Sequence, residues 1–168
     1  VWRHVGRGTF FGPRPILNLG DVEYLSEHCR PTEVIESRLA IEPQLARLAA
    51  VHGTTSSFAE MRKCKQRCTT ANSWRVYEAW DNNYHQAIAK ATNNKLLISL
   101  FDTINIVRRS TVWGQLRSTK LPPENFSSFQ EHDAIYDAIV ARDADLAADL
   151  MHSHLRSVRS RLYAPLED

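Results

Sequence analysis

The sequence lacks the features that mark membrane-spanning and secreted proteins. No run of about 18 apolar residues occurs, so no transmembrane helix is predicted. The first residues also lack the apolar core of a signal peptide. Cysteine is scarce, and the odd set of Cys29, Cys64 and Cys68 fits a reducing cytoplasm better than a disulfide framework. We therefore expect a cytoplasmic protein with no membrane partner.

The sequence also lacks a large excess of either positive or negative charge. The 21 basic and 19 acidic residues give a formal charge of +2, whereas a dedicated nucleic-acid-binding domain usually has a stronger basic bias. The sequence is instead rich in hydrophobic residues. They make up 43% of the 168 residues and include 4 Trp, 5 Tyr and 6 Phe. This amount is enough for one domain with a buried core.

Glycine and proline are concentrated near the start and are then sparse until Pro122 and Pro123. A long stretch with helical periodicity and few breakers predicts an all-α fold. We expect an antiparallel bundle of six to seven helices. The predicted helices are 19–29, 32–51, 56–71, 73–92, 95–115, 126–141 and 143–162. Predicted boundary residues are the N-caps Thr32, Ser73 and Asp143, with Gly53, Asn93 and Asn94 as helix stops.

Cys64 and Cys68 are four residues apart and could face one ligand together. The charged neighbours Lys63, Lys65 and Arg67 favour an exposed helix face instead. We therefore predict no metal site at this pair.

Asp81 and His85 are also four residues apart, so both project from one face of the helix 73–92. A carboxylate and an imidazole stacked in this way are a common half-site for a transition metal. His132 lies three residues from Phe129 and from Ile135, within the apolar stripe of its helix.

His154 shares the phase of Leu150 and Val158 on the last helix, and it too is predicted to point inward. His152 falls about 200° away by the helical period and should point outward. Any one inward histidine is most simply a core residue with a backbone or tyrosine partner. The four inward groups together favour one divalent metal, with Zn²⁺ or Ni²⁺ expected from the ligand types.

A metal bound by three imidazoles and one carboxylate leaves room for a water or a ligand if its coordination expands beyond four. The sequence contains no His-Glu-x-x-His motif and no paired Glu-x-x-His motifs, which weakens an enzymatic interpretation. Arg38 lies in an apolar stripe and needs an anion, either an effector carboxylate or a neighbouring Glu36 or Glu42. On the helix 95–115, the further effector-binding candidates are Asn105, Arg108 and Arg109.

These residues resemble a known family. Residues 34–50 (VIESRLAIEPQLARLAA) look like the opening helix of the C-terminal domain of FadR-type GntR transcription regulators. Segments 81–85 (DNNYH) and 91–97 (ATNNKLL) are similar to that family's Asp-x-x-Phe-His and Ala-Thr-x-Asn-x-x-Leu segments, with Tyr84 in place of the usual Phe. The last two helices are similar at Glu131, His132, Ala138, Ile139, Arg142, Asp143, Ala148, Met151, His154 and Leu155.

The resemblance implies an effector-binding domain over residues 16–168, with a metal at Asp81, His85, His132 and His154 and a homodimeric assembly. Arg38 matches a family position that often grips carboxylates. Residues 5–11 look like the wing of a winged helix-turn-helix, so residues 1–15 are expected to be a wing remnant and linker. The rest of the DNA-binding domain is not in the sequence, so we expect operator DNA to be bound only through that missing part.

Three functions follow as hypotheses. The first is a sensor that binds a small organic acid through a divalent metal and Arg38 and so modulates DNA binding of the intact regulator. The second is a metal-dependent hydrolase or isomerase that uses the same open site. The third is a structural metal that ties the last helices to the helix 73–92. We expect the first, and no enzymatic activity.

Overall fold

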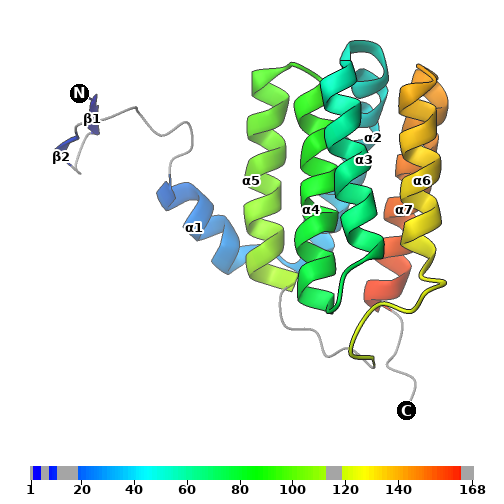
Figure 1. Cartoon of the computed structure of the whole chain (residues 1–168). Coiled ribbons are helices and arrows are strands. Elements are labelled where there is room, and N and C mark those ends of the chain that lie inside the picture. Colours follow the sequence, from blue (N-terminus) through cyan, green and yellow to red (C-terminus); the bar gives the residue numbers. More distant parts are fainter. Residues whose placement is uncertain (1, 5–7, 11–18, 113–118, 164–168) are drawn as a thin grey trace.

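The computed structural model describes residues 2–4, 8–10, 19–112 and 119–163. Within these residues the chain forms a short antiparallel hairpin followed by seven helices (Figure 1). The elements are β1 (Trp2–His4), β2 (Gly8–Phe10), α1 (Leu19–His28), α2 (Pro31–His52), α3 (Thr55–Thr69), α4 (Trp74–Ala91), α5 (Lys95–Val112), α6 (Ser127–Val140) and α7 (Ala144–Tyr163). The prediction of an all-α bundle is confirmed.

The bundle is built around α2, which packs against α4, α5, α6 and α7. In Figure 1 the helices α5, α4, α3 and α6 run side by side, and α1 leans against α5. Residues from distant parts of the sequence therefore meet in the middle. None of the described helices is long and apolar enough to cross a membrane.

The hairpin pairs Trp2 with Phe10 and makes no contact with the described helices. It lies within the segment that the sequence predicts to be a wing remnant. The other residues of that segment, 1, 5–7 and 11–15, lie outside the described residues, as does the predicted end of the fifth helix at 113–115.

Helix ends agree with most of the predicted boundaries. Ser73 accepts a hydrogen bond from the amide of Val76, and Asp143 accepts one from the amide of Leu146. Asn93 adopts the left-handed conformation, with φ of 53°. The prediction of Thr32 as an N-cap is wrong. Pro31 already occupies the first helical turn, so the cap falls on Arg30, whose amide donates to the carboxylate of Glu33 (2.8 Å).

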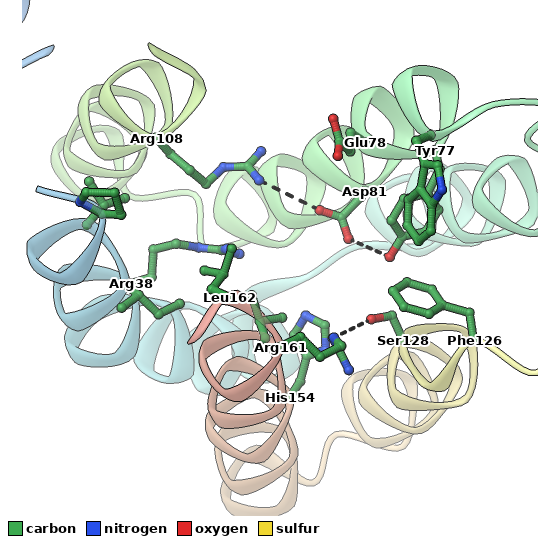
Figure 2. A pocket seen from close by; sticks show the side chains of 15 residues that line it. Arg38, Tyr77, Glu78, Asp81, Arg108, Phe126, Ser128, His154, Arg161 and Leu162 are labelled. Carbon is green, nitrogen blue, oxygen red and sulfur yellow. Dashed lines mark hydrogen bonds and ion pairs between the residues drawn. The ribbon is translucent and has the colours of Figure 1, made fainter. Parts of the chain in front are cut away.

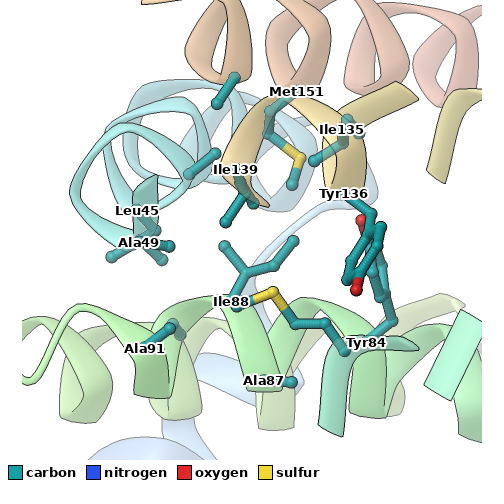
Figure 3. Close-up of a cluster of buried hydrophobic side chains, with 14 of the residues drawn as sticks. Leu45, Ala49, Tyr84, Ala87, Ile88, Ala91, Ile135, Tyr136, Ile139 and Met151 are labelled. Atoms are coloured by element: carbon teal, nitrogen blue, oxygen red, sulfur yellow. The ribbon is translucent and has the colours of Figure 1, made fainter. Parts of the chain in front are cut away.

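The core lies where α2, α4, α6 and α7 meet. Figure 3 shows Ile88 of α4 facing Ile139 of α6 and Met151 of α7, with Leu45 of α2 beside them. These side chains are almost completely buried. A core of this kind fixes the relative positions of the four helices, three of which carry the histidines predicted to bind a metal.

The predicted exposure of Cys64 and Cys68 is wrong. Both thiols are buried, and both cysteines are free. Their face of α3 packs inward because α3 contacts α4 and α6, while Lys65 reaches outward to an ion pair with Asp133. Burial raises the pKa of Cys64 to about 11, so its thiol stays protonated at neutral pH.

Candidate metal and effector site

Three buried histidines from three different helices face one another inside the bundle. His85 lies on α4, His132 on α6 and His154 on α7, and at most 3% of each residue is exposed. One nitrogen atom from each ring can be chosen so that all three lie within 4.8 Å of one another. The helical phase of the apolar neighbours predicted an inward direction for His132 and His154, and the structure adds that the three rings converge. His152 is exposed, as predicted.

Asp81 joins this group from one turn earlier on α4. Its Oδ1 lies 3.5 Å from Nε2 of His132 and accepts a hydrogen bond from the hydroxyl of Tyr77 (3.2 Å). Zinc–ligand bonds of about 2.0–2.1 Å place neighbouring tetrahedral ligands about 3.4 Å apart, so this spacing suits two ligands of one ion. The structure thus groups three of the predicted ligands, His85, His132 and His154, and places the fourth, Asp81, beside His132.

Two glutamate carboxylates contact the outer edges of two of the three histidine rings. Oε2 of Glu42 lies 2.6 Å from Nδ1 of His85, and Oε2 of Glu131 lies 2.6 Å from Nδ1 of His154. A metal-binding histidine usually donates its second ring N–H to a carboxylate, which fixes the ring orientation and the tautomer. Both carboxylates therefore leave Nε2 of their histidine as the atom that faces the centre of the cluster.

The imidazole nitrogens that face the centre of the cluster form no hydrogen bond with any described residue. Both ring nitrogens of His85, both ring nitrogens of His132 and Nε2 of His154 are buried without a hydrogen-bond partner among the described residues. The approach of Glu42 to Nδ1 of His85 is therefore a close contact of an ion-pair type and not a well-aligned hydrogen bond. Buried polar atoms are normally paired, because water is lost without replacement. A single cation at the centre would satisfy the inner nitrogen of each ring.

The protonation states suit a cation. Burial lowers the pKa of His132 well below its ordinary value and also lowers that of His154, so both rings are neutral at physiological pH. Burial alone would raise the pKa of Asp81, but the histidines and Arg108 hold it below its usual range. Neutral imidazoles and an ionised carboxylate are the forms that bind metal, and this set suits zinc or nickel.

Arg38 has a partner inside the protein. Its Nε donates to Oε1 of Glu42 (2.5 Å), and both side chains are buried. Of the two anions considered from the sequence, the internal one is therefore present. Burial favours a neutral Glu42, yet Arg38 and His85 hold its pKa well below the ordinary value. Glu42 thus connects Arg38 directly to one of the candidate metal ligands.

A cavity of ≈ 100 Å³ lies against this cluster (Figure 2). Arg38, Asp81, Arg108 and His154 all line it, so two cationic side chains and two candidate metal ligands face one partly open space. Figure 2 shows Arg38 and Arg108 on one side, Tyr77 and Phe126 on the other, and Asp81 and His154 between them. An anion in this cavity would lie within reach of both the metal position and the arginines.

The remaining effector candidates are placed differently. Arg108 lines the cavity, and its guanidinium hydrogen bonds to Asn82 (2.9 Å) and Asn105 (3.3 Å). Asn105 is buried and lines a smaller neighbouring hollow with Glu42 and His85 rather than the main cavity. Arg109 is exposed and lines neither space.

Several side chains at the site were not predicted from the sequence. Glu131 was noticed only as part of a family pattern, and Glu42 only as a neighbour of Arg38. For Glu42 the sequence held one usable signal, namely its position four residues after Arg38 on the same helix. The cavity is also lined by Trp74, Phe126, Ser128 and Arg161, for which no sequence signal stood out.

The FCD domain family matches residues 33–157, which is most of the chain. The chain belongs to this family. The FCD match begins in α2 and ends in α7, and so includes the four candidate ligands and both outer carboxylates. The resemblance to the C-terminal domain of FadR-type GntR regulators is thereby confirmed.

Relatives of this FCD domain are transcriptional regulators and not enzymes. The chain is 30% identical over 138 residues to the Uxu operon transcriptional regulator of Escherichia coli K12, covering 79% of this chain and 53% of that protein. It is 29% identical to the galactonate operon transcriptional repressor of the same organism, covering 93% of this chain and 71% of that protein. It is 31% identical to a putative L-lactate dehydrogenase operon regulatory protein, covering 77% and 50%. The chain spans about half the length of most curated relatives that it matches.

Solved structures show the same fold. E. coli McbR/YncC superposes with a TM-score of 0.70 at 17% identity, covering 79% of this chain and 67% of that one. Streptococcus agalactiae GntR superposes with a TM-score of 0.62 at 23% identity, covering 86% and 61%. At these identities the likeness concerns the helical architecture alone.

Proposed function

We propose that this FCD domain is the sensing part of a DNA-binding transcription regulator and that it responds to a small organic acid. A divalent metal, zinc or nickel, is held by Asp81, His85, His132 and His154. The acid binds in the adjoining cavity. The observation that carries the proposal is the set of buried, unpartnered imidazole nitrogens that borders a cavity lined by two arginines.

The chemistry of the site favours a carboxylate. Three imidazoles and one carboxylate give the metal four protein ligands, and a carboxylate oxygen of the acid becomes a further ligand when the coordination expands beyond four. Arg38 and Arg108 line the same cavity and offer charge-assisted hydrogen bonds to the other oxygen. The names of two relatives mention lactate and galactonate, both of which are carboxylates. Asn105 contributes indirectly, because its Oδ1 accepts a hydrogen bond from Nε of Arg108.

In the intact regulator, we propose that the domain is a cytoplasmic homodimer whose protomers shift relative to each other when the acid binds. Residues 1–15 are the wing and linker that lead to it from a winged helix-turn-helix, which alone contacts the operator. Two-fold operators and two-fold protein dimers match in such systems. Light scattering in solution tests the dimer directly, and a monomeric mass with and without metal would contradict it.

A melting experiment tests the sensor. The protein is stripped with a chelator, reloaded with Zn²⁺ or Ni²⁺, and melted with a panel of small carboxylates. We expect the metal to raise the melting temperature and at least one acid to raise it further. Arg38→Ala should lose the second shift, whereas Arg47→Ala, on the same helix and in an exposed ion pair with Asp145, should keep it.

Two results would contradict the sensor. Turnover of any acid in the panel would favour a metal-dependent enzyme. A protein that unfolds on chelation and gives no shift with any acid would favour a purely structural metal.

A further inference from the structure

The cavity has two chemically different ends, and this division limits what can bind there. Arg38 and Arg108 stand at one end, and the rings of Tyr77 and Phe126 stand at the other (Figure 2). Asp81 and His154 lie between them. A ligand held by its acid group at the arginines and the metal must therefore place the rest of its body against aromatic rings.

Part of the cavity wall is apolar, and Glu78 and Arg161 line the cavity as well. Among the described residues, Val34 and Ile35 line the cavity from α2, and Val158 and Leu162 line it from α7. These side chains cannot hydrogen bond to a ligand. They favour a ligand body without hydroxyl groups, because a hydroxyl that leaves water for such a wall loses its hydrogen bonds.

The polar atoms at the aromatic end already have partners. The hydroxyl of Tyr77 donates to Asp81 (3.2 Å), and the indole N–H of Trp74 donates to the backbone oxygen of Thr119 (2.9 Å). Oγ of Ser128 accepts from Nη2 of Arg161 (2.8 Å). A ligand rich in hydroxyl groups would have to displace these bonds, since they occupy the polar groups of this end.

The rings at this end are arranged to receive another ring. Trp74, Tyr77 and Phe126 meet edge to face, with interplanar angles of 82–89° and centroid distances of 5.3–5.7 Å. Aromatic pairs prefer this geometry, and a ligand ring can extend it. The cavity of ≈ 100 Å³ is smaller than the roughly 150 Å³ apolar cavity that holds one benzene molecule, so its size limits a ligand to no more than one ring.

We propose that the effector is a small carboxylic acid with one aromatic ring, and not a polyhydroxylated acid. The acid group lies toward Arg38, Arg108 and the metal, and the ring lies toward Trp74, Tyr77 and Phe126. This inference rests on the proposed function, since it assumes that an acid binds in this cavity.

Calorimetry on the zinc-loaded protein tests the proposal with four probes. Phenylacetate carries the ring and the charge, phenylacetamide the ring alone, acetate the charge alone, and gluconate the charge with hydroxyl groups. We expect phenylacetate to bind at least about tenfold more tightly than each of the other three, since the ring and the charge each contribute.

A matched pair of variants locates the ring. Phe126→Ala removes a ring that lines the cavity, whereas Phe129→Ala removes a ring of the same cluster that does not line it. We expect Phe126→Ala to weaken phenylacetate about fivefold or more without changing acetate or zinc affinity, and Phe129→Ala to change none of them. If Phe126→Ala does not fold, Phe126→Leu, which removes the ring but keeps an apolar side chain, takes its place with the same expectation.

Gluconate binding as tightly as phenylacetate would overturn the proposal while leaving the sensor intact. Equal losses of phenylacetate affinity in Phe126→Ala and Phe129→Ala would also overturn it. If zinc binds and none of the three acids does, the proposed acid sensor itself fails, so the two failures are distinguishable.

Discussion

Glu131 offers a direct test of the metal centre, because it acts on a candidate ligand without being one. Its Oε2 lies 2.6 Å from Nδ1 of His154, a ring that is almost completely buried. The Glu131 side chain itself is 22% exposed, so its removal leaves no large hole in the core. His154 holds the pKa of Glu131 below its ordinary value despite partial burial, which shows that the two groups interact.

The expected size of the effect follows from this geometry. Without the carboxylate, His154 loses the contact that fixes its ring and directs Nε2 inward. Loss of such an outer partner typically weakens metal affinity 10–100-fold, or about 1.4–2.8 kcal/mol. At a zinc concentration of 100 times the original dissociation constant, stabilisation by the metal would fall from about 2.7 to about 0.4–1.4 kcal/mol. For a chain of this length, the melting temperature should fall by about 3–9 °C.

The assay is a zinc titration by calorimetry, with melting curves recorded with and without metal. Glu131→Ala should show the full loss, and Glu131→Gln, which keeps an acceptor but no charge, should lie between it and the unmodified protein. Asp133→Asn serves as the control, because Asp133 is on the same helix but pairs with Lys65 away from the histidines. Unchanged zinc affinity in Glu131→Ala would refute the assignment of His154 as a ligand oriented by Glu131.

Further predictions concern the two histidines of α7, the buried ion pair and a helix end. His154→Ala should weaken zinc binding by at least about 100-fold in a calorimetric titration, whereas the exposed His152→Ala should leave it unchanged. Arg38→Met should lower the free energy of unfolding by about 3–5 kcal/mol in urea, because Glu42 keeps a buried charge, and adding Glu42→Met should recover much of that loss. Gly53→Ala should cost about 1–3 kcal/mol in the same assay, since the new Cβ would lie 2.5 Å from a helix carbonyl oxygen and 2.6 Å from a phenyl ring.

The helices were predictable because their apolar residues recur with the helical period and their ends carry recognisable caps. Ser73 and Asp143 are examples, since each accepts a hydrogen bond from an amide three residues later. The prediction failed where local composition competes with packing. Charged neighbours suggested that Cys64 faces solvent, but α3 is covered by α4 and α6, and tertiary contact decided the burial. Local sequence carries no information about which helix will cover which face.

The candidate metal ligands were predictable for a related reason. A polar residue in an apolar stripe must point inward, and His132 and His154 each stand in such a stripe. The phase of a helix reports the direction of a side chain but not what lies opposite it. The sequence therefore could not show that Arg108, rather than the exposed Arg109, reaches the cavity.

Glu42 shows most clearly what sequence reasoning misses. From the sequence it was one of two possible partners for Arg38 on its own helix, and that local pairing is present. Its other contact, 2.6 Å to Nδ1 of His85, joins α2 to α4 and depends on the packing of the bundle. Because one carboxylate touches both an arginine of the cavity and a candidate metal ligand, any acid that draws Arg38 away from Glu42 also changes the surroundings of His85. If the metal changes the affinity of the protein for the acid, thermodynamic linkage requires the acid to change the affinity for the metal by the same factor.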